Sequence, residues 1–425
     1  MDKLLVIIFV LGYLAIALEH LIKINKSAVA LTTGVLCWVV LLLSGHQGSH
    51  AAGEALVGHL GELSGILFFL LGAMTIVELI DSHSGFTLVA RLFKTTSKRR
   101  LLWGVGLLCF FMSAVLDNLT TTIVMVTLLK KVISKSDERL LFAGIVVIAA
   151  NAGGAWSPIG DVTTTMLWIS GRVTAARLVH DLFLPSLVCL AVPLAIVSFS
   201  LRGTLTALPV EEIQDEKLSA TPFERNLVLF LGISLLLMVP VFKTLAGLPP
   251  FAGMLLALGI LWAVTDILHI RDRDRGRMFS ANEALHRIDS SSILCFLGIL
   301  LAVGALQFSG KLLQLALFTE RIFHRPEWIA GILGVLSAII DNVPLVGSAI
   351  AMYDLSFYPV DHPFWQMLAY SAGTGGSMLI IGSAAGVAAM GLAKINFFWY
   401  LRKIAPLAAA GFLVGGATFL LMHSL

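Results

Sequence analysis

The sequence predicts an all-α integral membrane protein, and three observations support this fold class. First, 58% of the 425 residues are hydrophobic and only 13% are charged, with a mean hydropathy of +0.92. Second, apolar runs of about 17–25 residues, long enough to cross a bilayer as a helix, recur along the whole chain. Third, short polar motifs inside apolar segments occur twice at nearly the same spacing. We therefore expect about ten transmembrane helices in two related halves.

The transmembrane helices are predicted at ten apolar runs. They lie near residues 4–22, 28–44, 60–80, 140–170, 178–200, 225–243, 250–268, 290–308, 364–396 and 403–423. A secretory signal peptide is the alternative for the first run, but only Lys3 stands in its basic region and no small-residue cleavage site precedes Glu19. We expect this run to form the first helix.

Two further apolar regions, 101–133 and 328–353, predict re-entrant helical hairpins. Their centres carry the matching motifs Ser113-Ala-Val-Leu-Asp-Asn118 and Ser337-Ala-Ile-Ile-Asp-Asn342. The Asp-Asn pair leaves arms of about 16 and 15 residues in one region and about 13 and 10 in the other, mostly too short for a bilayer of about 30 Å at about 1.5 Å per residue. One long kinked helix is the alternative for each region; Pro344, which follows the second motif, argues against it there.

Two of the ten runs are predicted to be broken at their centres. Residues 151–161 align with residues 373–383, and both segments place Gly, Ser or Thr in the middle of a hydrophobic helix. This composition is typical of discontinuous transmembrane helices. A glycine-rich helix-packing face is the alternative, and it explains the glycines but not Asp161.

The motifs divide the chain into a first repeat over 1–200, a polar linker over 201–224 and a second repeat over 225–425. Each repeat has three helices, a hairpin, a broken helix and a final helix; this odd number of crossings predicts that the second repeat is inverted in the membrane. About three quarters of the 29 Lys and Arg residues fall in loops on one side, which the positive-inside rule makes cytoplasmic. Both termini are then predicted outside, in the periplasm.

The polar residues at the hairpin tips and helix breaks are candidate cation ligands. A carboxylate inside hydrocarbon costs roughly 2.5–3.5 kcal/mol, so its repetition at matching positions indicates a transport role. Carboxylate, amide, hydroxyl and backbone oxygens also suit a hard cation such as sodium. The candidates are Asp117, Asn118, Thr120, Thr121, Asn151, Ser157, Asp161, Thr164, Asp341, Asn342, Thr374 and Ser377.

The expected sodium site lies among Asp117, Asp161 and Asp341. Burial disfavours the charged form of a carboxyl group and a bound cation favours it, so sodium and a proton compete for one group. Asp161 is the predicted proton-coupled acid because the matching position of the other repeat holds Ser383. For Asp117 and Asp341 the rival role is to cap the second hairpin arm.

Residues 113–122, 151–165 and 341–345 resemble the NhaD-type sodium/proton antiporters of the ion transporter superfamily. The resemblance begins at Glu19-His20 and covers nearly the whole chain. Glu19 and His20 lie at the end of the first predicted helix and are candidates for a pH-sensing or accessory transport role; a solvated or snorkelling side chain at the membrane interface is the alternative. The resemblance implies exchange of Na⁺ or Li⁺ for H⁺ across a bacterial inner membrane, with no cofactor beyond the transported ions. It also implies a homodimer in which a scaffold dimerises and a transport domain moves as an elevator.

Two other functions remain as alternatives. Arsenite, another oxyanion or an organic anion could be carried on the same scaffold, since fold does not fix function. Superfamily members that carry dicarboxylates have neutral residues at the equivalent tips, whereas unprotonated aspartates here would repel an anion. A remote alternative is an intramembrane aspartyl protease, but Asp354 and Asp161 stand in the wrong order and the required glycine pattern is incomplete. We therefore expect a transporter rather than an enzyme.

Overall fold

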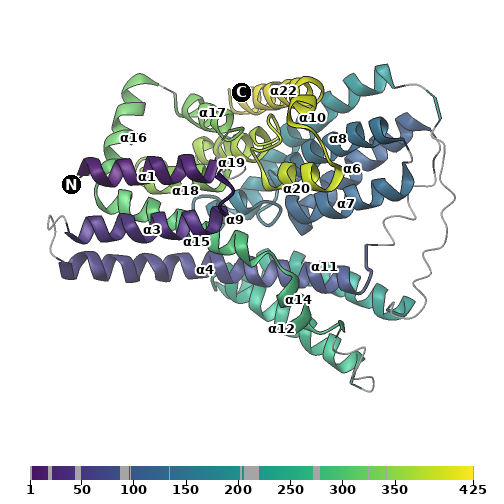
Figure 1. The fold of residues 1–425 in the computed structure, drawn as a ribbon, viewed down its shortest axis with the longest axis horizontal. Coiled ribbons are helices and arrows are strands. Elements are labelled where there is room, and N and C mark those ends of the chain that lie inside the picture. The colour runs from purple at the N-terminus through teal and green to yellow at the C-terminus, as the bar shows by residue number, and fades with distance from the viewer. Residues whose placement is uncertain are drawn as a thin grey trace.

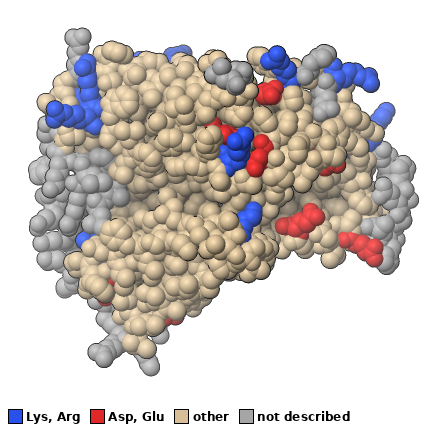
Figure 2. Space-filling model, turned by 180° about the vertical axis from the view of Figure 1, so that it is seen from behind, with Lys and Arg blue, Asp and Glu red and all other residues tan. Residues whose placement is uncertain are grey.

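The computed structural model describes residues 2–17, 22–43, 49–86, 95, 97–133, 135–201, 203–204, 220–270, 278–323, 325–339 and 342–424. Across these ranges the regular secondary structure consists of helices, with no named strand, and this confirms the predicted all-α class. Eight helices in these ranges are long and apolar enough to cross a membrane. Uncharged surface covers most of the face drawn in Figure 2, as expected of a chain embedded in lipid.

Six long helices pack together on one side of the molecule (Figure 1), and we call them the scaffold helices. They are α1 (Asp2–Ala17), α3 (Lys26–Leu43), α4 (Ser49–Ser82), α11 (Pro222–Ala246), α12 (Pro250–Leu268) and α15 (Ser290–Phe308). In this group α3 packs against α15 and α4 packs against α12, while α1 lies on α3 as α11 lies on α12. The contacts of the earlier three helices are thus mirrored by those of the later three.

The remaining segments form a second group, and we call all helices of this group the inner helices. The group is built around two helices that are largely buried. They are α6 (Lys98–Leu116), α7 (Asn118–Val132), α8 (Ser136–Gly154), α9 (Val162–Ile169), α10 (Ala175–Ser200), α17 (Pro326–Leu336), α18 (Asn342–Met352), α19 (Pro363–Gly375), α20 (Ala384–Ala393) and α22 (Ala405–Ser424). Helix α6 packs on α8 as α17 packs on α19, and α10 packs on α22. Every residue of α8 from 142 to 154 is buried, which makes it a central helix. Three short helices complete the fold: α14 (Ala281–Arg287) packs on scaffold helix α4, α21 (Phe397–Lys403) packs on inner helix α22, and α16 (Lys311–Ile322) runs between the two groups.

Helices α6 and α7 are separated by Asp117 alone, and they contact each other (Figure 1). Asp117 has a φ of +81°, a value that residues other than glycine rarely adopt. Its side chain accepts hydrogen bonds from Thr120 N at 2.7 Å and Thr120 Oγ1 at 2.9 Å, which caps α7. The predicted arm length is wrong for α6, whose 19 residues make it long enough to be a candidate span.

Both predicted breaks lie between consecutive helices of the inner group. Residues 155–161 separate α8 from α9, and residues 376–383 separate α19 from α20. Glycine is needed at each break because a hairpin arm approaches very closely. A Cβ added to Gly153 would lie 2.2 Å from Phe110 O, and one added to Gly375 would lie 2.1 Å from Gly334 O. The two close approaches occupy matching positions of the repeated segments.

Candidate functional site

Asp161 is buried where the first break meets both hairpin motifs, with 2% of its surface exposed. It caps α9, since its Oδ1 accepts hydrogen bonds from Thr163 N and Thr163 Oγ1, each at 2.9 Å. Its Oδ2 accepts from Asn118 Nδ2 at 2.6 Å and from Asn342 Nδ2 at 3.5 Å. The two amides come from the first residues of α7 and α18, so both motifs of the repeat reach one carboxylate.

Asn151 connects this carboxylate to the second break. Its Oδ1 accepts a hydrogen bond from Asn118 Nδ2 at 3.0 Å. Its Nδ2 donates to Ser377 Oγ and Ser383 Oγ, each at 2.9 Å. A continuous network therefore runs from the acid through two amides to the hydroxyl groups of the second break.

The donors to Asp161 in this network are neutral amide, hydroxyl and backbone groups. Each amide also carries a carbonyl oxygen, so a turn of the Asn118 or Asn342 amide presents oxygen in place of nitrogen. Such a turn replaces hydrogen-bond donors with the oxygen ligands that a hard cation needs. The site can therefore hold a cation next to Asp161 or, with the acid protonated, no cation. Among the described residues no group of three or more His, Cys, Asp or Glu side chains is arranged to hold a metal ion.

The serine of each repeated motif anchors its hairpin to a buried helix. Ser113 Oγ donates to Ala150 O of α8 at 2.6 Å, and Ser337 Oγ donates to Ala372 O of α19 at 2.9 Å. Ser157 Oγ donates to the carbonyl of Ala114, which attaches the first break to the same hairpin. These bonds hold the Asp-Asn tips beside the breaks.

Five of the predicted site residues share the network described above: Asn118, Asn151, Asp161, Asn342 and Ser377. Thr164 and Thr374 lie nearby, but their hydroxyl groups donate to Asp161 O at 2.9 Å and Tyr370 O at 2.6 Å, respectively. Thr120 donates to Asp117, as described above. The buried Thr121 Oγ1 has no hydrogen-bond partner in the part of the chain that the structure describes. Three predicted residues lie outside that part: Glu19, His20 and Asp341.

Sequence reasoning missed Thr163 and Ser383 as members of the site. Thr163 follows Asp161 by two positions, where a helix-capping carboxylate accepts from backbone N–H groups, so the capping rule could have identified it. Ser383 was placed opposite Asp161 in the repeat but was given no role. Its bond to Asn151 depends on the spatial approach of the two breaks, which no local pattern reveals.

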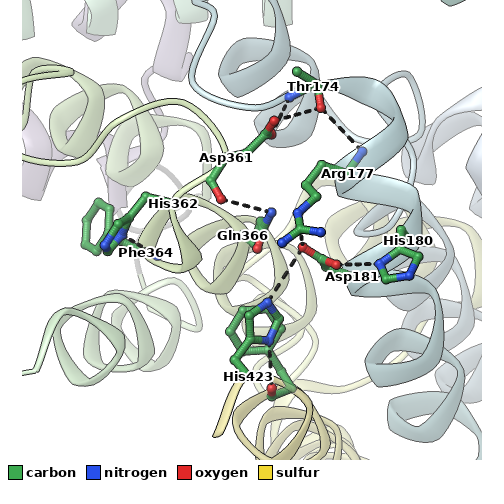
Figure 3. A network of polar contacts seen from close by, with 10 residues as sticks. Thr174, Arg177, His180, Asp181, Asp361, His362, Phe364, Gln366 and His423 are labelled. Atoms are coloured by element: carbon green, nitrogen blue, oxygen red, sulfur yellow. Dashed lines mark hydrogen bonds and ion pairs between the residues drawn. The ribbon is translucent and has the colours of Figure 1, made fainter. Parts of the chain in front are cut away.

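A second polar cluster lies outside this site, at the start of α10 (Figure 3). The carboxylate of Asp181, which is 3% exposed, lies 3.2 Å from Arg177 Nε, 2.6 Å from His180 Nδ1 and 3.6 Å from His423 Nε2. His423 belongs to α22, so the cluster connects the last helix of the chain to α10. It therefore supports the packing of these two helices.

The fold and the site together define a multi-pass membrane transport protein. The sequence profile described as citrate transporter matches residues 4–359. Sodium/proton antiporter 1 of Arabidopsis thaliana is 48% identical over 425 residues, which cover 100% of this chain and 73% of that protein. Sodium/proton antiporter 2 of the same plant is 47% identical over 98% of this chain and 99% of its own length.

The bacterial relatives extend the same relationship. The Na⁺/H⁺ antiporter NhaD of Vibrio cholerae is 31% identical over 448 residues, which cover 98% of this chain and 91% of that protein. The chain therefore belongs to the citrate transporter family and, within it, to the group of antiporters that includes NhaD. The NhaD resemblance predicted from the motifs is confirmed.

Proposed function

We propose that this protein exchanges Na⁺ or Li⁺ for H⁺ across a membrane, with the exchange centred on Asp161. The observation that carries the proposal is the buried carboxylate held by Asn118 and Asn342, one amide from each repeated motif. A cation bound at this carboxylate displaces its proton, and protonation releases the cation, so competition for one group produces antiport. The relatives named sodium/proton antiporters support the choice of ions.

We assign Asn118, Asn151, Asn342 and Ser377 to the binding and orientation of the cation, because their polar groups join Asp161 in one network. Asp117 lies one residue before this network and is half-buried. We include it and Asp341 as acids that complete the site. The exchange requires the transported ions alone and no cofactor.

We further propose two inverted repeats, over 1–200 and 225–425, joined by a cytoplasmic linker. The paired contacts support this division, since α6 on α8, α1 on α3 and the close approach at Gly153 each have a counterpart in the later half. The distribution of Lys and Arg supports termini in the periplasm of a bacterial cell. The resemblance supports a homodimer whose scaffold helices are fixed while the inner helices move.

The exchange is tested in everted membrane vesicles from a strain that lacks its own antiporters. Addition of sodium or lithium, but not potassium, is expected to collapse a preformed pH gradient in vesicles with the wild-type protein. Asp161→Asn and Asp117→Asn remove one negative charge each and are expected to abolish or strongly reduce the collapse. Asp354→Asn, in an exposed loop, is the matched control and should retain it.

No response between pH 6.5 and 9.5, with the protein inserted at normal levels, would contradict cation exchange. Uptake of citrate or another carboxylate anion would then be measured, since the matching family profile is described as citrate transporter. Activity retained in Asp161→Asn would instead move the exchange away from this carboxylate.

A further inference from the structure

The two halves of the inner group contact the scaffold helices unequally. Helix α18 packs on α15, and α9 packs on α4. Their counterparts in the repeat, α7 and α20, pack on each other and on α8, and the described residues show no comparable packing of either on a scaffold helix. The internal symmetry is therefore broken between the inner helices and the scaffold.

The contacting segments share one side of the molecule. The loops after α9 and α18 meet where Arg172 Nη2 donates to Ile350 O at 3.2 Å and Arg172 O accepts from Asp361 N at 2.9 Å. This side carries few basic residues, whereas α7 leads to Lys130 and Lys131 on the lysine-rich side. By the positive-inside rule these contacts lie at the periplasmic ends, whereas α7 and α20, at the cytoplasmic ends, have no comparable packing on the scaffold among the described residues. This asymmetry is the one expected of a conformation open toward the cytoplasm.

One residue of α9 receives contacts from two scaffold helices. Trp168 is 1% exposed, and its ring meets Phe69 of α4 edge-on, with the ring centroids 6.2 Å apart. Lys243, in the last turn of α11, donates from Nζ to Trp168 O at 3.1 Å. The same Nζ lies 4.7 Å from the centroid of the Trp168 ring. One ammonium group thus binds both the backbone and the ring of this residue.

The contact between Lys243 and Trp168 has the chemistry of a stabilising link between the scaffold helices and the inner helices. The carbonyl of Trp168 accepts a hydrogen bond from Gly171 N at 3.2 Å and lies at the carboxyl end of α9, where the last carbonyl groups carry partial negative charge. A cation is attracted to such a helix end and to the face of an indole ring. Because α9 belongs to the inner helices and α11 to the scaffold, any sliding of one along the other must separate Lys243 from Trp168.

We propose that Lys243 and Trp168 form a latch that stabilises the cytoplasm-open conformation. This inference rests on the moving arrangement in the proposed function. When α7 and α20 replace α18 and α9 against the scaffold, the latch opens and the site faces the periplasm. Loss of the latch therefore lowers the fraction of protein that is open to the cytoplasm.

The test measures exposure of α7 from the cytoplasmic side. Thr127, exposed on α7, is replaced by cysteine in a chain whose buried native cysteines are replaced by alanine. Those cysteines are Cys37, Cys109, Cys189 and Cys295. A membrane-impermeant maleimide is applied to everted vesicles, and the rate of labelling is recorded. This readout requires no ion gradient and no transport.

Lys243→Met is expected to lower the labelling rate by about threefold or more, because fewer molecules are open to the cytoplasm. Lys243→Arg keeps the cation and should label at the wild-type rate. Lys3→Met, an exposed lysine on the same predicted side, is the control and should also leave the rate unchanged. Trp168→Leu removes the ring and provides a second variant with the same expected fall, should Lys243→Met not insert.

An unchanged rate in Lys243→Met, or an equal fall in Lys243→Arg or Lys3→Met, would overturn the latch. A labelling change in a protein that shows no sodium/proton exchange would refute the proposed ions and retain the latch. If sodium/proton exchange depends on Asp161 but the labelling rate does not depend on Lys243, the proposed exchange is retained and the latch is refuted. The two proposals are therefore tested separately.

Discussion

Within the described part of the chain, the carboxylate of Asp161 accepts hydrogen bonds from Thr163 N and Oγ1 and from the side-chain amides of Asn118 and Asn342. The sequence predicted Asp161 as the proton-coupled acid because an acid within an apolar segment is costly and because the matching position of the other repeat holds Ser383. The amides of Asn118 and Asn342 were predictable from their repetition. The bridging role of Asn151 was not, since it depends on contacts between residues more than two hundred positions apart.

Replacement of Asn118 with alanine tests this network. The substitution leaves Asp161 Oδ2 and Asn151 Oδ1 each without one donor, and an unsatisfied buried group costs about 1–3 kcal/mol. We expect a lower melting temperature in detergent and a strong loss of sodium-dependent exchange. Asn226→Ala on scaffold helix α11 is the control. Equal effects of the two substitutions would contradict a special role for Asn118.

The inner helices depend on small residues where hairpin arms and breaks meet. The sequence indicated both breaks through their glycines, but it could not tell a flexible kink from a close approach between backbones. The structure assigns the second role to Gly153 and Gly375, each of which faces a backbone carbonyl at less than 2.5 Å from an added Cβ. The length of α6 was misjudged because its charged start, from Lys98, was left out of the apolar run.

Gly153→Ala is expected to destabilise the protein. The new methyl group would meet Phe110 O at 2.2 Å, and overpacking of this kind typically costs about 1–3 kcal/mol. Gly104→Ala is the matched control on α6, since nothing lies within 4 Å of its added Cβ and alanine favours the helix. Thermal unfolding in detergent should distinguish the two variants, with a lower melting temperature for Gly153→Ala than for Gly104→Ala. A melting temperature at or above that of the wild type would disprove the close contact.

Two buried histidines form a further feature that periodicity did not reveal. His83, just after α4, lies with its ring centroid 5.4 Å from that of His269 and 4.8 Å from that of Phe279. Its Nδ1 lies 2.7 Å from Leu79 O, and the described residues offer no hydrogen-bond partner to its Nε2. Burial lowers the pKa of His83 below its usual value of 6.5. The hydrogen bond with the Leu79 carbonyl and the charge of Glu224 oppose this shift, and the charge of His269 adds to it.

This pKa shift predicts that the protein loses stability in acid. Between the folded pKa and 6.5 the unfolded chain binds more protons at His83 than the folded chain, so stability falls as the pH drops through this window. His83→Gln is expected to reduce the dependence of the melting temperature on pH between 5 and 8. His286→Gln, on the surface helix α14, serves as the control. An identical pH dependence in His83→Gln and the wild type would rule out this origin.

At the scale of the whole molecule, composition and motif spacing predicted the helical membrane class, and five of the predicted site residues lie in one hydrogen-bond network. Composition and spacing could not predict which segments rest on the scaffold, because α9 and α18 have counterparts at matching positions in the other half of the chain, α20 and α7. The contacts of Trp168 with Phe69 and Lys243 distinguish one arrangement from the other. Such contacts join residues from three distant helices and leave no local pattern.

The serine anchors bear on how ions would reach Asp161 in the proposed exchange. Ser113 and Ser337 fasten each hairpin to the neighbouring buried helix, and glycine brings the same segments into backbone contact. Neither hairpin can then swing aside alone as a gate without breaking a buried bond. In the proposed exchange, the ion pathway would then open and close at the border between the inner helices and the scaffold. A blocker aimed at this border would stop transport without entering the binding site.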